Sequence, residues 1–345
     1  MVKLGYDMNY SGARMELPVK AVLRAEELGF DSVWASESYG SDAFIPLAFL
    51  AAHTKKIRLG TGIAQLAART PANFAMVVQT LEELAGRGRV VAGIGLSGPQ
   101  IVEGWYGQPW GRPNVRLRDY VSIVRKILRR EGPVTHDGPE IALPYTGPGS
   151  SGLGKPLKSI LHGNPEIPLL IGASKPANMR LAGEMADGWI AMHVTPETLP
   201  ECVALLEAGM AKRTDGKSLK DFEIVVNVGV QVTDDVKAAF AKAKPALALY
   251  VGGMGAKEKN FHKDAMVERG FGEAAERIQE LFLAGHKDEA IAAVPDEYLD
   301  GSSLIGPPER IRERFPRWRD SGFTTIRLTR PREDAMELMS KLAGA

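Results

Sequence analysis

Glycines and small polar residues mark the positions where this chain could hold a ligand. The run from Gly93 to Gly98 has glycine at positions 93, 95 and 98 and a serine at 97, which matches the spacing of a dinucleotide-binding fingerprint. That fingerprint wants an acidic residue at the end of a second strand about 20 residues later. Asp119 has that spacing but lies inside a helical pattern, and three strand–helix units precede the run. The pattern favours small residues that let a ligand approach the backbone at a strand end; a tight turn is the alternative.

Two further small-residue motifs follow strand-like runs. One spans Thr61 to Ala64, and the other runs from Gly172 through Ala173 and Ser174 to Pro176. Pro176 is suited to the first position of a helix, and the free N–H groups of a helix start bind phosphate without a charged side chain. The second motif therefore predicts a site for a phosphorylated cofactor. A simple helix cap at Ser174 explains the same spacing equally well.

The motifs of several enzyme classes are absent from the sequence. There is no HExxH, no P-loop, no Gly-x-Ser-x-Gly elbow and no pair of histidines at metal-ligand spacing, so we expect no metal. Cys202 is the only cysteine, which excludes an internal disulfide, and it lies in a helical pattern that predicts a buried apolar role. Glycine-rich strand ends without a nucleophile favour a cofactor that carries the reactivity itself.

Charge and hydropathy limit the classes of binding partner that we expect for this protein. The 345 residues are 44% hydrophobic and 25% charged, with a formal net charge of +1. This balance gives no electrostatic reason to expect nucleic acid or an anionic membrane as a partner. No apolar run reaches the roughly 20 residues that a membrane span needs, and the N-terminal residues lack the apolar core of a signal peptide. We therefore expect a cytoplasmic protein that acts on a small-molecule substrate.

Eight strand-like runs alternate with helical periodicity, which predicts an α/β fold. Eight is the number that a closed (β/α)8 TIM barrel requires, and the continuous apolar character of several runs is typical of a sheet covered by helices. A doubly wound open sheet is the structural alternative. The predicted strands are Lys3–Asn9, Ser32–Ser36, Ile57–Ala64, Arg89–Gly95, Pro168–Gly172, Trp189–Val194, Glu223–Val232 and Thr324–Thr329.

Repeated joints and two long connections describe the organisation of the chain. Gly29, Gly188 and Gly322 each stand between a helical pattern and a strand that begins with an aromatic residue, as expected where glycine ends a helix in the left-handed conformation. The repetition predicts a single domain over residues 1–345. Insertions of about 99–167 and 236–303 follow strands four and seven, at the face where barrel enzymes place their chemistry. The patterns also predict helices over Leu17–Leu28, Phe44–Ala52 and Asn73–Leu84.

The residues around these motifs resemble a known family. Residues 57–63 and 81–95 are similar to the luciferase-like monooxygenase superfamily. Residues 97–107 and 184–189 resemble its branch that depends on coenzyme F420, a deazaflavin, and the Ser-Gly-Pro-Gln run that begins at Ser97 is the most specific part. The resemblance spans nearly the whole chain. It implies a barrel whose mouth holds the cofactor.

The resemblance also implies where that cofactor lies. Its ring is expected on a bulge in the third strand that contains a cis peptide between Gly62 and Ile63, and its phosphate near the ends of the fifth and sixth strands. A cis bond without proline costs about 3 kcal/mol, so it persists only where the surroundings impose it. The expected cofactor-binding residues are Thr61, Gly62, Ile63, Ala64, Ser97, Gly98, Gly172, Ala173, Ser174 and Met192.

One departure from the family affects the mechanism. Several relatives have an acidic residue followed by histidine after the second strand, whereas here Glu37 is followed by Ser38. A mechanism assisted by that histidine is therefore not carried over. Glu37, Tyr39, Glu103 and His193 remain candidate proton donors beside Ser38. For Glu103 the alternative is a carboxylate favoured at a helix start, and for His193 a hydrogen-bonded histidine at a strand end.

The expected activity is hydride transfer between reduced coenzyme F420 and a small organic substrate, in which the protein supplies orientation, a dry pocket and a proton. The first alternative is an FMN-dependent monooxygenase on the same barrel. The second is a flavin- or F420-binding protein without turnover. Members of the family are commonly dimers, which leads us to expect a homodimer.

Overall fold

The computed structural model describes residues 1–254 and 260–344. Eight parallel strands form a closed barrel, because the last of them, β12, pairs with the first, β1. This confirms the (β/α)8 prediction and excludes the open sheet. In their order around the barrel the strands are β1 (Lys3–Asp7), β2 (Ser32–Ala35), β3 (Arg58–Thr61), β5 (Val90–Gly95), β8 (Leu169–Ala173), β9 (Gly188–Ala191), β10 (Glu223–Val232) and β12 (Thr325–Thr329).

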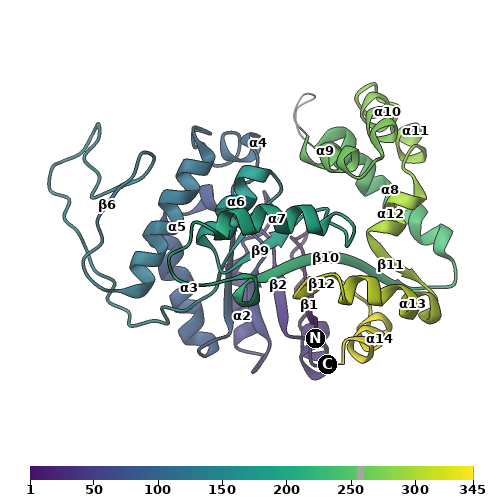
Figure 1. Cartoon of the computed structure of the whole chain (residues 1–345), viewed down its shortest axis with the longest axis horizontal. Helices are drawn as coiled ribbons and strands as arrows, with labels where there is room; N and C mark the ends of the chain where they lie inside the picture. Colours follow the sequence, from purple (N-terminus) through teal and green to yellow (C-terminus); the bar gives the residue numbers. More distant parts are fainter. Residues whose placement is uncertain (255–259, 345) are drawn as a thin grey trace.

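Apolar side chains on the strands explain why the barrel forms. Leu4 of β1 lies beside Ile326 of β12, and Val33 of β2 beside Leu59 of β3; all four are buried. Burial on both faces of the strands is what a parallel sheet wrapped in helices requires. The two termini meet at one end of the barrel, as Figure 1 shows.

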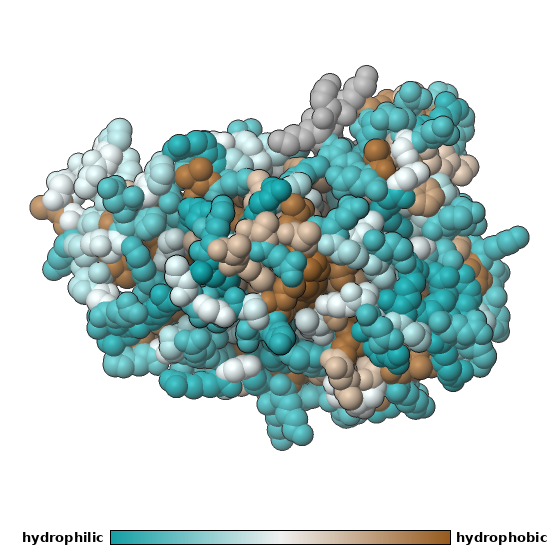
Figure 2. All heavy atoms as spheres, viewed as in Figure 1, coloured by the Kyte–Doolittle hydropathy of each residue, from teal (hydrophilic) through white to brown (hydrophobic). Residues whose placement is uncertain are grey.

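Helices cover the outside of the barrel and follow the expected spacing. In α3, Thr70 caps the N-terminus by accepting a hydrogen bond from the Asn73 N–H at 3.2 Å, Pro71 occupies the first turn, and Gly86 follows at a φ of 99°. The face in Figure 2 is mostly hydrophilic, as expected for helices that bury only one side. The helices are α1 (Val19–Glu27), α2 (Phe44–Ala51), α3 (Pro71–Ala85), α6 (Pro176–Met185), α7 (Leu199–Met210), α13 (Pro308–Arg319) and α14 (Glu333–Ala343).

The first insertion contains helices and a projecting arm. The short helix α4 (Pro99–Val102) is followed by α5 (Pro113–Arg129) and then by an arm with a small antiparallel hairpin, β6 (His136–Asp137) and β7 (Ala142–Leu143). Figure 1 shows this arm extending away from the barrel. Asp119 is buried in α5 and accepts hydrogen bonds from the backbone of the arm, which confirms that it ends no second strand.

The second insertion is a helical unit over one end of the barrel, at the upper right of Figure 1. Its helices pack around an apolar cluster of their own that includes Met266, Ile278 and Tyr298. Residues 255–259, inside this insertion, and Ala345 lie outside the described residues. The helices are α8 (Val236–Gly253), α9 (Phe261–Glu268), α10 (Gly272–Leu283), α11 (Lys287–Ala292) and α12 (Asp296–Gly301).

Three local features differ from the predictions. The third predicted strand divides into β3 and β4 (Ala64–Gln65), followed by a 3-10 turn, η1 (Leu66–Ala68). An additional strand, β11 (Ser303–Gly306), pairs with residues 229–232 of β10, the part of that strand that extends beyond the barrel. A second 3-10 turn, η2 (Leu219–Asp221), precedes β10. The joint at Gly188 is not left-handed, unlike those at Gly29 and Gly322. Gly188 is required instead because a Cβ there would lie 2.6 Å from the Glu223 carbonyl oxygen.

Candidate active site at the mouth of the barrel

A bulge between β3 and β4 lies at the mouth of the barrel. The peptide between Gly62 and Ile63 is cis, as predicted. Strand β2 and the residues after it hold the bulge: the Gly62 N–H donates to the Ala35 carbonyl at 2.8 Å, and the Ser36 hydroxyl donates to the Gly62 carbonyl at 2.7 Å. The Ile63 carbonyl accepts from the Glu37 N–H at 3.0 Å. Both residues of the bulge stay half-buried, so they form part of the accessible surface.

Two glycines on neighbouring strands make room for the bulge. A Cβ at Gly95 of β5 would lie 2.9 Å from Ile63 Cγ1, and one at Gly172 of β8 would lie 2.8 Å from Ile63 Cγ2. Both distances are shorter than van der Waals contact, so Ile63 fits only because these positions lack side chains. The motifs at Gly93–Gly98 and Gly172–Ser174 therefore act together: they support the bulge from the side opposite β2.

A polar cluster fills the barrel interior beneath the bulge. Arg327 of β12 is fully buried; its guanidinium lies 5.1 Å from the Trp34 ring and 3.9 Å from the Asp7 carboxylate, and it also bonds Asn227. A Cβ at Gly62 would collide with this guanidinium. Burial lowers the pKa of Arg327, opposed by Asp7. Sequence reasoning missed this group because each member lies on a different strand and none belongs to a motif.

The other expected cofactor-binding residues differ in exposure. Ser97 is half-buried with a φ of 59°, an uncommon conformation for a residue other than glycine, and Gly98 directly precedes α4. Thr61 turns its hydroxyl to β5, where it bonds both the N–H and the carbonyl of Gly93. Ala64 is fully buried beneath the surface, whereas Met192 is 41% exposed.

The expected phosphate loop begins a helix, as predicted. Helix α6 starts at Pro176, and its N-cap is Lys175 rather than Ser174, without a side-chain cap bond. Ser174 is half-buried and does not cap the helix, which removes the simple-cap interpretation. The Ala173 carbonyl accepts a 2.8 Å hydrogen bond from the Trp189 indole, which fixes the loop to β9.

Among the residues after β2, Glu37 has a buried carboxylate with a structural role, whereas its neighbours Ser38 and Tyr39 are accessible. Both oxygens of Glu37 accept hydrogen bonds from Arg69 at 2.9 Å, and one also accepts from the Gln65 N–H at 2.8 Å. Glu37 is 8% exposed, so this buried, fully paired carboxylate is poorly placed to donate a proton. Ser38 is half-buried and Tyr39 is 54% exposed. Glu103 is also exposed and caps a turn by accepting from the Trp110 N–H at 3.3 Å.

His193 is the expected proton donor that the structure pairs with a second histidine. It is the second residue after β9, and its Nε2 lies 2.7 Å from His262 Nδ1, on α9 of the second insertion. The Tyr250 ring of α8 lies 4.7 Å from the His262 ring, and its hydroxyl is hydrogen-bonded to that of Tyr10, which follows β1. His262, Tyr250 and Tyr10 were not predicted, since only the tertiary fold brings them to the barrel mouth.

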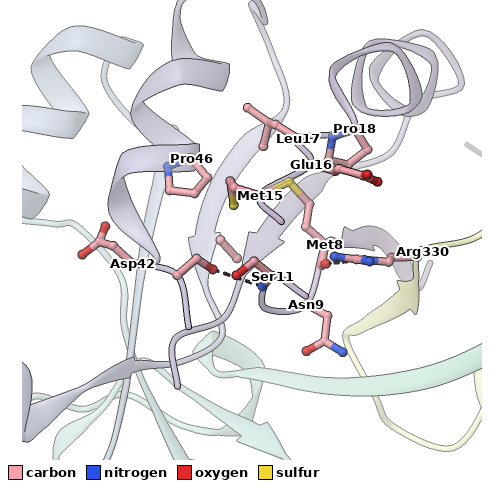
Figure 3. A pocket seen from close by; sticks show the side chains of 12 residues that line it. Met8, Asn9, Ser11, Met15, Glu16, Leu17, Pro18, Asp42, Pro46 and Arg330 are labelled. Carbon is pink, nitrogen blue, oxygen red and sulfur yellow. Dashed lines mark hydrogen bonds between the residues drawn. The ribbon is translucent and has the colours of Figure 1, made fainter. Parts of the chain in front are cut away.

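A shallow hollow lies beside the end of β1, separate from the bulge (Figure 3). It lies between the start of α1 and Pro46 of α2, with Arg330 on one side, whose Nε donates to the Met8 carbonyl at 2.8 Å. None of the expected site residues lines it. Among the described residues no group of three metal-ligating side chains is present, and no helix is long and apolar enough to cross a membrane.

Comparison with known proteins places this architecture in a family. The profile of the luciferase-like monooxygenase family matches residues 6–325. The chain belongs to this family. A protein of Mycobacterium tuberculosis, whose name describes it provisionally as a coenzyme F420-dependent oxidoreductase, is 43% identical over 330 residues, which cover 95% of each chain.

More distant relatives include proteins with named activities. A 5,10-methylenetetrahydromethanopterin reductase of Archaeoglobus fulgidus is 29% identical over 88% of this chain and 86% of its own. The solved structure of the coenzyme F420-dependent tetrahydromethanopterin reductase of Methanopyrus kandleri superposes with a TM-score of 0.79 at 24% identity, covering 99% of this chain and 97% of its own. At that identity the likeness shows the barrel fold and no more.

Proposed function

We propose that this protein is an oxidoreductase that transfers hydride between coenzyme F420 and a small organic substrate. The observation that carries the proposal is the bulge at Gly62–Ile63, which is held by β2 and fitted between Gly95 and Gly172. It gives the barrel mouth a small, partly accessible platform at the strand ends where barrel enzymes bind their ligands. The 43% identical relative supports F420 as the cofactor.

The residues at the mouth fit a large planar cofactor with an anionic tail. Ile63 and Ser97 offer a surface for the ring, and the loop from Gly172 to Ser174 leads into the α6 N-terminus, where backbone N–H groups favour phosphate. A bound deazaflavin would supply the hydride chemistry. The protein's own residues would hold the ring, exclude water and move a proton.

Binding of F420 and FMN, measured side by side, tests this proposal. Trp34 lies directly beneath the bulge, since a Cβ at Gly62 would approach its ring to 3.2 Å, so occupation of the platform should quench its share of the emission of the five tryptophans. We expect micromolar or tighter binding of F420 with weak binding of FMN. Selective FMN binding with oxygen uptake would assign an FMN-dependent monooxygenase instead. Binding without reaction with any substrate would leave a carrier protein.

We also propose that the protein forms a homodimer. Ile45 and Phe49 on α2 and Met76 on the neighbouring α3 are 72%, 53% and 60% exposed, and large apolar side chains exposed together mark interaction surfaces. Light scattering of the purified protein checks this: we expect twice the mass of one chain, and a monomer over the micromolar range would contradict it.

A further inference from the structure

One hydrogen bond connects the barrel to the helix that covers its mouth. His193 belongs to the barrel, as the second residue after β9, and His262 belongs to α9 in the second insertion, 69 residues later. Their nitrogens Nε2 and Nδ1 lie 2.7 Å apart, and the rings meet edge to face at 80°. The same helix reaches the barrel again through Asp264, whose carboxylate lies 2.7 Å from Lys175 Nζ.

Both histidines are held in place by their neighbours. The buried Asn260 caps α9 by accepting from the His262 and Lys263 N–H groups, and its amide donates to two carbonyls at the end of α8. The Tyr250 ring contacts the His262 ring from α8. His193 has a φ of 59°, a conformation that persists in a residue with a Cβ only where the surroundings determine it. The pair is therefore preorganised.

The surroundings keep both rings neutral. Burial, then His262 and then Arg269 lower the pKa of His193 to about 3, and burial lowers the pKa of His262 to about 4. Among the described residues, the other titratable groups near the pair are Tyr250, Tyr10, Tyr39, Arg269 and the Lys175–Asp264 ion pair. Burial, then the hydrogen bond with Tyr10, raise the pKa of Tyr250. No carboxylate is among the groups that shift the pKa of either histidine within the described residues.

A bonded pair of neutral imidazoles has two arrangements. Each ring carries one N–H and one bare nitrogen, and the central bond uses one of each. If His262 Nδ1 donates, His193 Nε2 accepts. The hydrogen of His193 is then on its Nδ1, and His262 Nε2 has no hydrogen. If His193 Nε2 donates, the outer ends exchange roles. When the central proton moves while one outer nitrogen loses a proton and the other gains one, the donor end becomes an acceptor and both rings end neutral.

We propose that His193 and His262 form a proton relay for a carbonyl substrate, with His193 as the catalytic residue and His262 as its positioning residue. This inference rests on the proposed function. When hydride reaches the carbonyl carbon, a C–H bond forms and the π electron pair moves to the oxygen. The oxygen takes the proton of His193 Nδ1, His193 Nε2 takes that of His262 Nδ1, and His262 Nε2 takes a proton from water. Oxidation of the alcohol reverses each transfer.

The chemistry of a neutral pair selects the substrate class. A neutral imidazole is a weak acid, so it protonates only a strongly basic group, and the alkoxide oxygen that forms from a ketone or aldehyde is such a group. His193 is the end that meets substrate because it is the second residue after β9 at the barrel mouth, while His262 lies on the covering helix. The relay supplies a proton source where Ser38 replaces the histidine of relatives.

Nitrogen NMR of the protein labelled at its six histidines tests the pair without cofactor or substrate. We expect two imidazoles to stay neutral from pH 8 to about 5. The signals are assigned with the variants His193→Asn and His262→Asn, and His262→Asn is expected to raise the titration midpoint of His193, whose pKa His262 lowers. Titration of both rings near 6.5 in the unaltered protein would overturn the proposal.

Turnover of reduced F420 with small ketones and aldehydes tests the relay itself. In His262→Asn the amide nitrogen can still donate a hydrogen bond to His193 Nε2, as His262 Nδ1 does in the parent. An amide cannot, however, take up a proton from water and transfer another to His193. We expect kcat to fall by about 100-fold in this variant and in His193→Asn, with KM and F420 affinity within about threefold of the parent. His162→Asn, at an exposed position, is the matched control.

The outcomes separate the relay from the proposed function. Full kcat in His262→Asn would show that no proton passes through His262, and full kcat in His193→Asn would remove both roles; either result overturns the relay. If the unaltered protein binds F420 but reduces no carbonyl, while its histidine pair stays neutral, the carbonyl class is wrong. If it binds no F420, the proposed function is wrong, independently of the NMR result.

Discussion

Replacement of Gly172 by alanine tests whether the bulge is a fitted support. The new Cβ would lie 2.8 Å from Ile63 Cγ2, so Ile63 must move by more than about half an ångström to restore ordinary contact. Gly95 is the register partner of Gly172 and also faces Ile63 without a side chain, so the wild-type chain leaves room for Ile63 at both positions. Overpacking of this kind costs about 1–3 kcal/mol.

We therefore expect Gly172→Ala to lower the free energy of unfolding by about 2 kcal/mol. We also expect it to weaken F420 binding at least tenfold, because displacement of the bulge that costs about 1.4 kcal/mol of binding free energy corresponds to that factor. Urea unfolding and the quenching of tryptophan emission by F420 measure the two effects. Gly132→Ala is the control, because a Cβ at Gly132 meets nothing within 4 Å and its φ is not positive. Unchanged cofactor affinity in Gly172→Ala, with the control also unchanged, would refute the argument that this glycine supports the bulge.

Three further predictions concern stability. Glu37→Gln should lower the free energy of unfolding in urea by about 3 kcal/mol, because it leaves the buried Arg69 cation with less compensation. Burial raises the pKa of Asp187, but neighbouring cations and a backbone N–H lower it by more, so the pKa is lowered overall. Asp187→Asn should therefore destabilise the folded protein at pH 7, and its difference from the parent should shrink as the pH falls below about 4. The pKa values of His193 and His262 are lowered in the folded state, so between about pH 6.5 and 4 these two positions bind protons only in the unfolded chain. As the pH falls through this range, the pair should lower the free energy of unfolding by up to about 2.7 kcal/mol per pH unit, and a double asparagine variant should flatten this slope.

Local patterns predicted the barrel because each strand carries its own signal. Each of the eight predicted strands overlaps a strand of the barrel, and the cis peptide at Gly62–Ile63 was located from the motif around it. Strand β11 was missed because it is not one of the eight barrel strands and pairs with a part of β10 that extends beyond the barrel. The role of Gly188 was misjudged because its requirement comes from the backbone of Glu223, 35 positions away, and not from a local φ.

The site was less predictable, because its chemistry depends on contacts between distant segments. Sequence alone ranked Glu37 and His193 as equal candidates. The fold separates them, since Glu37 is paired with Arg69 whereas His193 is paired with another neutral ring. No motif in the sequence identified His262, which reaches the barrel only because Asn260 fixes the start of α9. Whether the expected residues contact F420 stays a prediction for the binding and variant experiments.

The two parts of the proposed site, the bulge and the histidine pair, depend on different elements of the fold. The bulge is held by β2, β5 and β8 and lies on Arg327 of β12, so none of the contacts described for it comes from the second insertion. The proposed relay needs α9, because His262 belongs to that helix and the Lys175–Asp264 ion pair joins it to the loop before α6. Such an exposed ion pair contributes only about 0.2–1 kcal/mol, so the His193–His262 bond and the Asn260 bonds to α8 must also help to keep α9 in place. Loss of α9 from the barrel would therefore remove the proton relay and leave the contacts of the bulge unchanged.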